Sequence, residues 1–264
     1  MNLASLLEAW GDAQVLAAGG ALIGLVFGFM AQRSRFCARA AVLECCNGQA
    51  GDRFSVWWLA LGAALVGTQV LVLGGWLKPG ASRFIANPGS VSGAVLGGLF
   101  FGAGMILTRG CASRLLILSA NGNLRALLSG LVFAVTVQAT MAGWLVPVRQ
   151  FFYNLWPIDG GPARDLQVLT GTAPWGGMVL ASVALASGIY FFWRQHTGRP
   201  WLAMGAVGSG LCIAAGWGFT QAVASQSFEP VAITSLSFSG PSAEWLMRVL
   251  STASVPGFGF DAGL

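Results

Sequence analysis

Charged residues are scarce in this chain. Asp, Glu, Lys and Arg together make up 9% of its 264 residues, whereas 55% are hydrophobic. A soluble domain of this length would lack the polar side chains needed to cover its surface. The composition therefore excludes an ordinary soluble fold and predicts an all-α integral membrane protein.

Residues that commonly hold metals or carry thiol redox chemistry are also few. His196 is the single histidine, and the five cysteines include no Cys-x-x-Cys pair. Structural zinc and thioredoxin-like chemistry are therefore poorly supported, and we expect no metal or cofactor. The formal charge of +5 comes without a basic patch interleaved with aromatics, so we expect no nucleic-acid partner.

Uncharged runs of membrane length divide the chain. Each is near or above the roughly 20 residues that cross a bilayer, and together they predict six transmembrane helices in a single membrane-embedded domain, 1–264. The amino terminus, MNLASLLEAWGD, lacks the basic region of a signal peptide, so we expect the first helix to remain in the mature protein. The runs are residues 13–32, 54–77, 84–108, 126–148, 166–193 and 200–228.

The charges between these runs predict the orientation. If the spans alternate, one side receives nine arginines against Glu44 and Asp52, while the other side is rich in Asp and Glu. By the positive-inside rule the amino terminus is then outside, and both cysteine-containing bends start from the cytoplasmic side. The nine are Arg33, Arg35, Arg39, Arg53, Arg109, Arg114, Arg125, Arg194 and Arg199.

One segment occurs twice. Residues 22–38 reappear at residues 96–112 with eight identities in seventeen gap-free positions, including Arg35/Arg109 and Cys37/Cys111. Shared hydrophobicity alone rarely keeps an arginine and a cysteine in register. We therefore predict an internal repeat with units of about 13–50 and 84–125.

In each repeat a short apolar stretch follows the cysteine. Residues 36–46 and 110–120 look helical but are too short to cross a membrane, and Asn-Gly pairs at 47–48 and 121–122 are typical helix stops. A long helix, a polar bend and a half-length helix predict a re-entrant or broken helix. Cys37 and Cys111 would then lie in its first turn, where free N–H groups attract anions. Arg35 and Arg109 would add charge, and arginine suits oxyanions.

The other cysteines have simpler interpretations. Cys212 lies inside a span and is expected to be a small buried hydrophobe, and Cys45 and Cys46 are expected to be structural.

Small residues also recur four apart in both repeats and predict close helix packing. Gly24→Leu and Gly98→Leu should therefore be more harmful than Gly19→Leu. The two stripes are Gly20, Gly24 and Gly28, and Ala94, Gly98 and Gly102.

These motifs resemble the YeeE/YedE sulfur transport family. The matching pieces are Q-R-S-R-F-C at 32–37, R-G-C-A-S-R at 109–114 and G-N-L-R at 122–125. The resemblance implies an hourglass-like inverted repeat in the bacterial inner membrane, with thiosulfate passed along a line of cysteines that includes Cys37 and Cys111. Arg35, Arg109, Gly110 and Arg114 complete the predicted binding site.

The chain departs from this family at two points. Many relatives carry Gly-Gly-Cys where this chain has Arg109-Gly110-Cys111, so its solute could differ or be held differently. The family's third relay cysteine lies in a further carboxy-terminal helix, whereas this chain stops at Leu264, and its ending, VPGFGFDAGL, resembles the start of another span. We therefore expect a chain truncated at its carboxy terminus.

The residues predict a sulfur-containing or anionic solute, and the resemblance implies non-enzymatic transport of a small sulfur anion, thiosulfate. A neutral thiol can donate a weak S–H···S contact to the soft terminal sulfur of thiosulfate. Weak contacts in series let a solute enter without being trapped. The alternatives are a membrane sulfurtransferase or thiol redox protein that forms a cysteine persulfide, and a structural subunit without transport. A TusA-like soluble sulfur carrier is a further expected partner, beside the lipid bilayer.

Overall fold

The computed structural model describes residues 4–48, 51–164, 168, 171, 175–195, 200–227 and 231–250. Most of this part of the chain is helical, as the composition predicts, and its sheet is one short strand pair. His196, Arg199 and the carboxy-terminal residues 251–264 lie outside the described residues.

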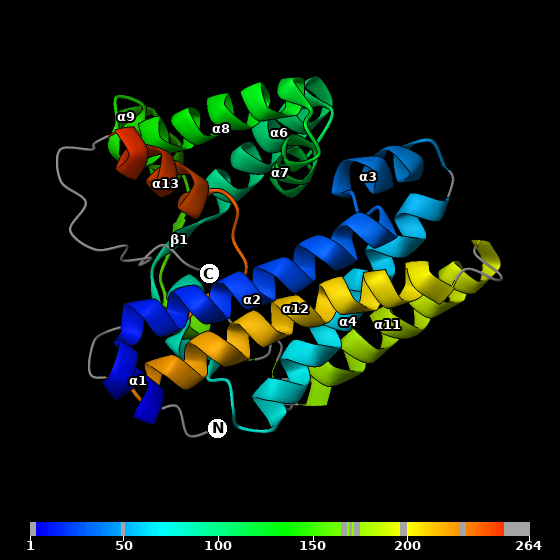
Figure 1. Cartoon of the computed structure of the whole chain (residues 1–264), viewed down its shortest axis with the longest axis horizontal. Coiled ribbons are helices and arrows are strands. Elements are labelled where there is room, and N and C mark those ends of the chain that lie inside the picture. The colour runs from blue at the N-terminus through cyan, green and yellow to red at the C-terminus, as the bar shows by residue number, and fades with distance from the viewer. Residues whose placement is uncertain are drawn as a thin grey trace.

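Six helices in the described part are long and apolar enough to cross a membrane, one for each predicted run. Their order and course can be followed in Figure 1. The prediction of six membrane helices is therefore confirmed. They are α2 (Asp12–Ser34), α4 (Asp52–Leu73), α6 (Val91–Thr108), α8 (Leu124–Ala142), α11 (Trp175–Gln195) and α12 (Pro200–Ala224).

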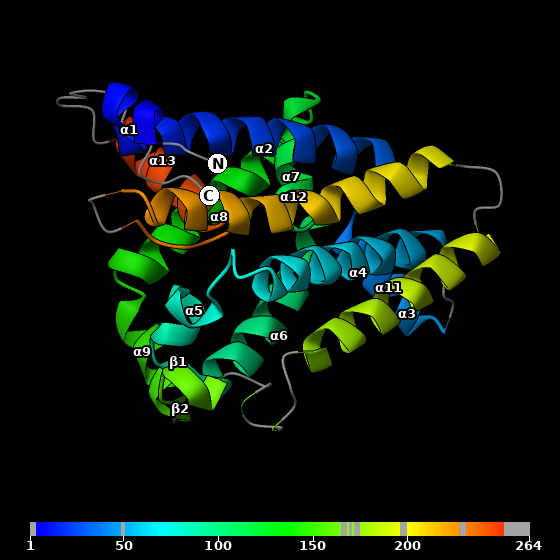
Figure 2. The same ribbon diagram turned by 90° about the horizontal axis from the view of Figure 1, so that it is seen from below.

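Short elements connect the long helices. Strand β1 (Gly89–Ser90) pairs antiparallel with β2 (Pro157–Ile158) at one end of the molecule (Figure 2). The two 3₁₀ turns are η1 (Pro79–Ala81) and η2 (Gly161–Arg164). The short helices are α1 (Ala4–Trp10), α3 (Ala38–Cys46), α5 (Arg83–Ala86), α7 (Ala112–Ala120), α9 (Val146–Asn154) and α13 (Gly240–Leu250).

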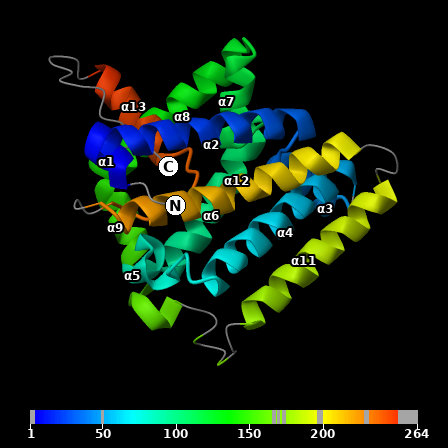
Figure 3. The ribbon, with the colours of Figure 1, turned by 60° about the horizontal axis from the view of Figure 1, so that its bottom comes forward.

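Four long helices lie side by side in the order α2, α12, α4, α11 (Figure 3). Glycines allow them to approach closely: a Cβ added at Gly62 of α4 would lie 2.6 Å from the Cα of Leu185 in α11. Gly210 of α12 lies against Ala60 and Ala63 of α4 in the same way. Small residues at helix crossings, rather than large apolar ones, thus set the spacing of this layer.

The remaining helices form a second group beside this layer. Helix α7 packs on α8, α8 on α13, and α6 on α9. Ile117 of α7 also packs against the core cluster of Phe27, Ala31 and Cys212, which belongs to α2 and α12. This contact places α7 next to α2.

The predicted glycine stripes do not pack as expected. A Cβ added at Gly24 or Gly28 in α2, or at Gly98 or Gly102 in α6, would meet no atom within 4 Å in the described structure. Gly19, which we expected to tolerate a larger side chain, instead lies directly under the ring of Phe219. The prediction that Gly24 and Gly98 hold helices together within this chain is therefore wrong, and the predicted ranking against Gly19 is reversed.

Arginines at the end of α2 and at the start of α4 lie together at one end of the four-helix layer. Arg53 donates a 3.3 Å hydrogen bond to the carbonyl oxygen of Arg35, and Arg33 lies over the ring of Trp201 at the start of α12. Phe54 contacts Phe191 close to the end of α11. The end of α2, the starts of α4 and α12 and the end of α11 therefore lie at the same end of this layer, whereas the membrane side that they face stays a prediction.

Candidate functional site

The two bends of the repeat have the same backbone geometry. Arg35 ends α2 and Arg109 ends α6, each in the left-handed conformation, with φ of 54° and 59°. Among the described residues these are the two with positive φ that are not glycine. A side chain pays for this conformation with a clash between Cβ and the backbone. Glycine adopts this conformation without that clash, so the backbone at position 109 suits glycine better than arginine.

Arg109→Gly is expected to leave the protein as stable as the parent or more stable by about 1 kcal/mol, because glycine adopts positive φ freely. Arg109→Ala is the matched control, since alanine also removes the charge but keeps the unfavourable conformation. Thermal unfolding of both variants in detergent measures the difference. A glycine variant less stable than the alanine variant would contradict this explanation.

Helices α3 and α7 begin directly after the cysteines. Cys37 and Cys111 are N-cap residues with extended backbones, one residue before the predicted first turn. The backbone amides of Ala40 in α3 and of Arg114 in α7 lie close to the sulfurs of Cys37 and Cys111, respectively. The amides of a first helical turn have no partner within the helix, so each short helix presents donors at its cysteine end. Both helices have nine residues and end at Asn47 or Asn121, as predicted.

The structure brings the two cysteines together. Cys37 is half-buried and Cys111 is buried, and their thiols lie within hydrogen-bonding reach of each other. The backbone amide of Ala38, in the first turn of α3, lies beside the sulfur of Cys111. The amino-terminal ends of α3 and α7, one from each repeat, therefore converge on one pair of thiols.

Polar groups of α7 surround this pair. The Oγ of Ser113 lies 3.3 Å from the Sγ of Cys111. The guanidinium of Arg114 is close enough to act electrostatically on Cys37, and its Nη1 is buried without a hydrogen-bond partner in the described structure. A buried donor without a partner is costly. The thiol pair thus lies in a positive environment with donor capacity left for an anion.

The remaining predicted site residues lie differently. The side chains of Arg35 and Arg109 are exposed, and these residues form the bends through their backbones. Gly110 is buried, and its carbonyl oxygen accepts a 3.0 Å hydrogen bond from the hydroxyl of Thr108. A direct part for these three residues in binding stays a prediction.

The other three cysteines lie apart from the site. Cys212 is buried beside Phe27 and Ala31, as expected of a small hydrophobe. Cys45 and Cys46 are exposed at the opposite end of α3 from Cys37. All five cysteines are free thiols.

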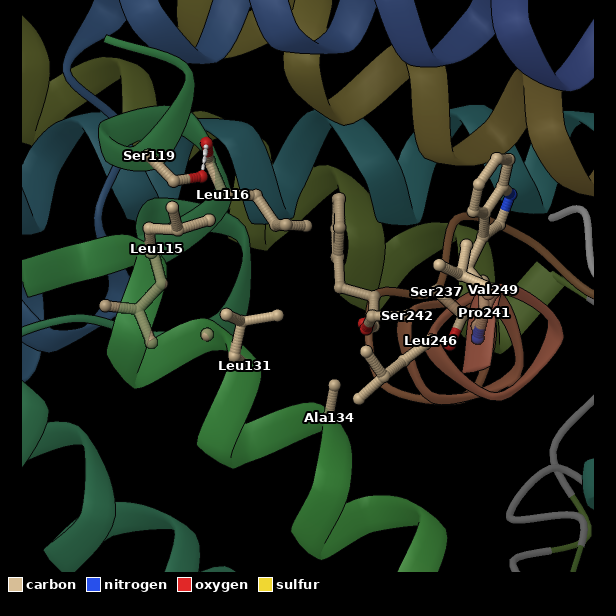
Figure 4. Close-up of a pocket in the computed structure, with 14 residues that line it drawn as sticks. Leu115, Leu116, Ser119, Leu131, Ala134, Ser237, Pro241, Ser242, Leu246 and Val249 are labelled. Carbon is tan, nitrogen blue, oxygen red and sulfur yellow. Dashed lines mark hydrogen bonds between the residues drawn. The ribbon is translucent and has the colours of Figure 1, made fainter. Parts of the chain in front are cut away.

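An apolar pocket of about 430 Å³ lies between α7, α8 and α13 (Figure 4). It begins at Leu115 and Leu116, one turn beyond Cys111, and Phe238 and Trp245 close it on the other side. Ser119, Ser237 and Ser242 are its polar residues, and no charged residue lines it. An anion would lose its hydration there without compensation, so this pocket does not suit an anion.

Some contacts of the site region were missed by sequence reasoning. Ser113 and the amide of Ala38 beside Cys111 were not predicted, although Ser113 stands within the R-G-C-A-S-R motif at 109–114. Nor was Glu44, whose carboxylate accepts the amides of Arg53 and Phe54 at 2.9 Å each and so caps α4 from the end of α3. The usual capping signal is a residue directly before the helix, whereas Glu44 lies eight residues before Asp52, so no local pattern reveals it.

Six helices of membrane length, with two thiols and a buried arginine nitrogen where the two repeats meet, define an integral membrane protein with an internal repeat. The chain belongs to the sulphur transport family, whose model matches residues 33–263. It is also similar to the thiosulfate transporter TsuA of Spirochaeta thermophila, with 26% identity over 190 residues, which are 68% of this chain and 55% of that protein. The chain thus spans about half the length of this curated relative.

Proposed function

We propose that this chain transports thiosulfate or a closely related sulfur anion, and that Cys37 and Cys111 pass the solute between them. The observation that carries the proposal is the meeting of two thiols at the amino-terminal ends of two short helices, one from each repeat. The similarity to a thiosulfate transporter supports the choice of solute.

The groups at the site suit both ends of thiosulfate. This dianion has sulfonate-like oxygens at one end and a soft terminal sulfur at the other. The helix amides and Arg114 attract the charged oxygens. Neutral thiols donate weak S–H···S contacts to the terminal sulfur. Two weak contacts in series allow the anion to move on, whereas one strong site would hold it.

The proposal assigns no covalent step to either cysteine, so the protein acts as a transporter and not as an enzyme. By the positive-inside rule the amino terminus lies outside the bacterial inner membrane and the arginine-rich end faces the cytoplasm. A TusA-like soluble sulfur carrier would then receive the anion beside that end, where Arg33, Arg35 and Arg53 are exposed or half-buried.

Uptake of ³⁵S-thiosulfate into liposomes that contain the purified chain tests this function. We expect saturable uptake that excess unlabelled thiosulfate abolishes. Sulfate should compete far less well, because it has a similar charge and shape but no soft sulfur. Equal competition by both anions would show that the site does not recognise the terminal sulfur and would contradict the proposal.

A further inference from the structure

We propose that Cys37 and Cys111 also form a reversible redox latch, in which a polythionate such as tetrathionate converts the two thiols into a disulfide that joins α3 to α7. The effect on transport rests on the function proposed above. Formation of the disulfide does not, because it requires only that the two thiols meet.

The position of the cysteines favours such a bond. Both are free thiols, and they lie within reach of each other on two separate short helices. Both are N-cap residues with extended backbones, outside the regular turns of their helices. The preceding helical turn that restricts χ1 inside a helix is absent there. Each side chain can therefore turn toward its partner while the helix that follows stays intact.

A disulfide nevertheless sets a geometric condition that the latch must meet. The two Cα atoms of a disulfide lie roughly 4.4–6.8 Å apart. Left-handed bends precede both cysteines, and the two short helices share few contacts with each other, since α3 packs chiefly on α4 and α7 on α8. Small shifts of α3 relative to α7 are thus not opposed by a packed interface between them.

The reaction with tetrathionate is balanced without another reagent. One thiol loses its proton and attacks a central sulfur of tetrathionate, the central S–S bond breaks, and one thiosulfate leaves. The cysteine then carries a mixed disulfide to the second thiosulfate. The other thiol loses its proton and attacks the cysteine sulfur, which releases that thiosulfate and forms the protein disulfide. Two thiols are oxidised, one tetrathionate is reduced to two thiosulfates, and two protons are released.

The surroundings select an anionic oxidant. Tetrathionate is a dianion, and Arg114 has a buried nitrogen without a partner next to Cys37. The same charge that attracts thiosulfate would therefore concentrate its oxidised dimer at the thiols. Once the disulfide has formed, neither sulfur carries a proton, so both donors to the soft end of the solute are lost. The two short helices are also held together at the point where the anion would pass.

A variant that retains only the two relay thiols tests the latch. Cys45→Ser, Cys46→Ser and Cys212→Ser remove the other thiols, all of which lie apart from the site. After treatment with tetrathionate we expect both remaining thiols to resist alkylation by N-ethylmaleimide. Mass spectrometry of unreduced peptides should find the Cys37 and Cys111 peptides linked, and dithiothreitol should restore both thiols. Uptake of labelled thiosulfate into liposomes should fall to the protein-free level and return after reduction.

Further variants separate the parts of this inference. With Cys111→Ser added, Cys37 should stop at the mixed disulfide and release one thiosulfate instead of two. Arg114→Gln should slow the reaction with tetrathionate more than the reaction with the neutral oxidant diamide. Two separate mixed disulfides in the two-thiol variant would overturn the latch. A linked pair with unchanged uptake would overturn the claim that the disulfide blocks thiosulfate transport. A linked pair in a protein that shows no uptake even when reduced would overturn the transport function and leave the disulfide standing.

Discussion

Replacing both Cys37 and Cys111 with serine is expected to abolish thiosulfate uptake while the protein still folds. A hydroxyl is nearly isosteric with a thiol but has no soft sulfur to meet the terminal sulfur of the solute. The N-cap position favours serine, so the helices that follow should form as before. Uptake into liposomes measures the loss, and the size-exclusion profile in detergent measures the fold. Each single variant should also lose uptake, because each thiol is one step of the relay.

Cys212→Ser is the matched control for this experiment. Its sulfur is buried in the cluster of Phe27 and Ala31, so a hydroxyl left unpaired there would cost roughly 1–3 kcal/mol of stability. Uptake should be retained at temperatures where this variant remains folded. Wild-type uptake by the Cys37→Ser, Cys111→Ser double variant would exclude both the cysteine relay and the sulfurtransferase. A stable persulfide on either cysteine of the parent protein after exposure to thiosulfate would favour the sulfurtransferase.

Local signals in the sequence predict the helices well. Uncharged runs locate all six long helices, and Asn-Gly pairs locate the ends of α3 and α7, where Gly48 and Gly122 adopt positive φ. These features depend on residues close together in the chain. The repeat adds long-range information, since two copies of one motif in register imply two equivalent bends, and the matched φ values of Arg35 and Arg109 agree with this.

Contacts between elements were predicted less well, because glycine spacing shows which face of a helix is smooth but not what covers it. In α2 and α6 the regular stripes remain open, whereas glycines that touch the backbone of another helix are not spaced four apart; they include Gly62, Gly188, Gly205 and Gly210. The chain after α12 is a second case. Residues 231–237 form neither helix nor strand, and the hydroxyls of Thr220 and Ser235 bond this segment to α12 through backbone carbonyls. Hydrogen bonds of this kind leave no periodic signal.

The candidate site was also predicted only in part: the sequence indicates which residues belong to it, but not how they come together. The repeat singles out Cys37 and Cys111, and the motif after the second cysteine includes Arg114, whose charge reaches the thiol of the first repeat. The approach of the two thiols could not be derived from spacing, because 74 positions in the chain and four α-helices, α3 to α6, separate them. It depends on how α7 packs against α2 and α12 through Ile117. Tertiary packing therefore turns two equivalent local motifs into one site.

Gly210→Leu is expected to prevent accumulation of folded protein, whereas Gly24→Leu should be tolerated. A Cβ added at Gly210 would lie 2.9 Å from the Cβ of Ala63 and closer still to the carbonyl oxygen of Ala60, so the obstacle is backbone that cannot rotate away. Overpacking costs about 1–3 kcal/mol where neighbouring side chains can yield, and the cost here should reach at least the upper end of that range.

Gly24→Leu adds the same side chain to a long helix, but a Cβ there meets no atom within 4 Å in the described structure. Expression in membranes and a monodisperse size-exclusion peak in detergent measure both variants, with Gly98→Leu as a second open position in α6. If Gly210→Leu accumulated as well as the two open-position variants, the α4–α12 contact would not be needed for folding. If instead the open-position variants failed, both stripes would be packing surfaces after all, against helices that this structure does not describe.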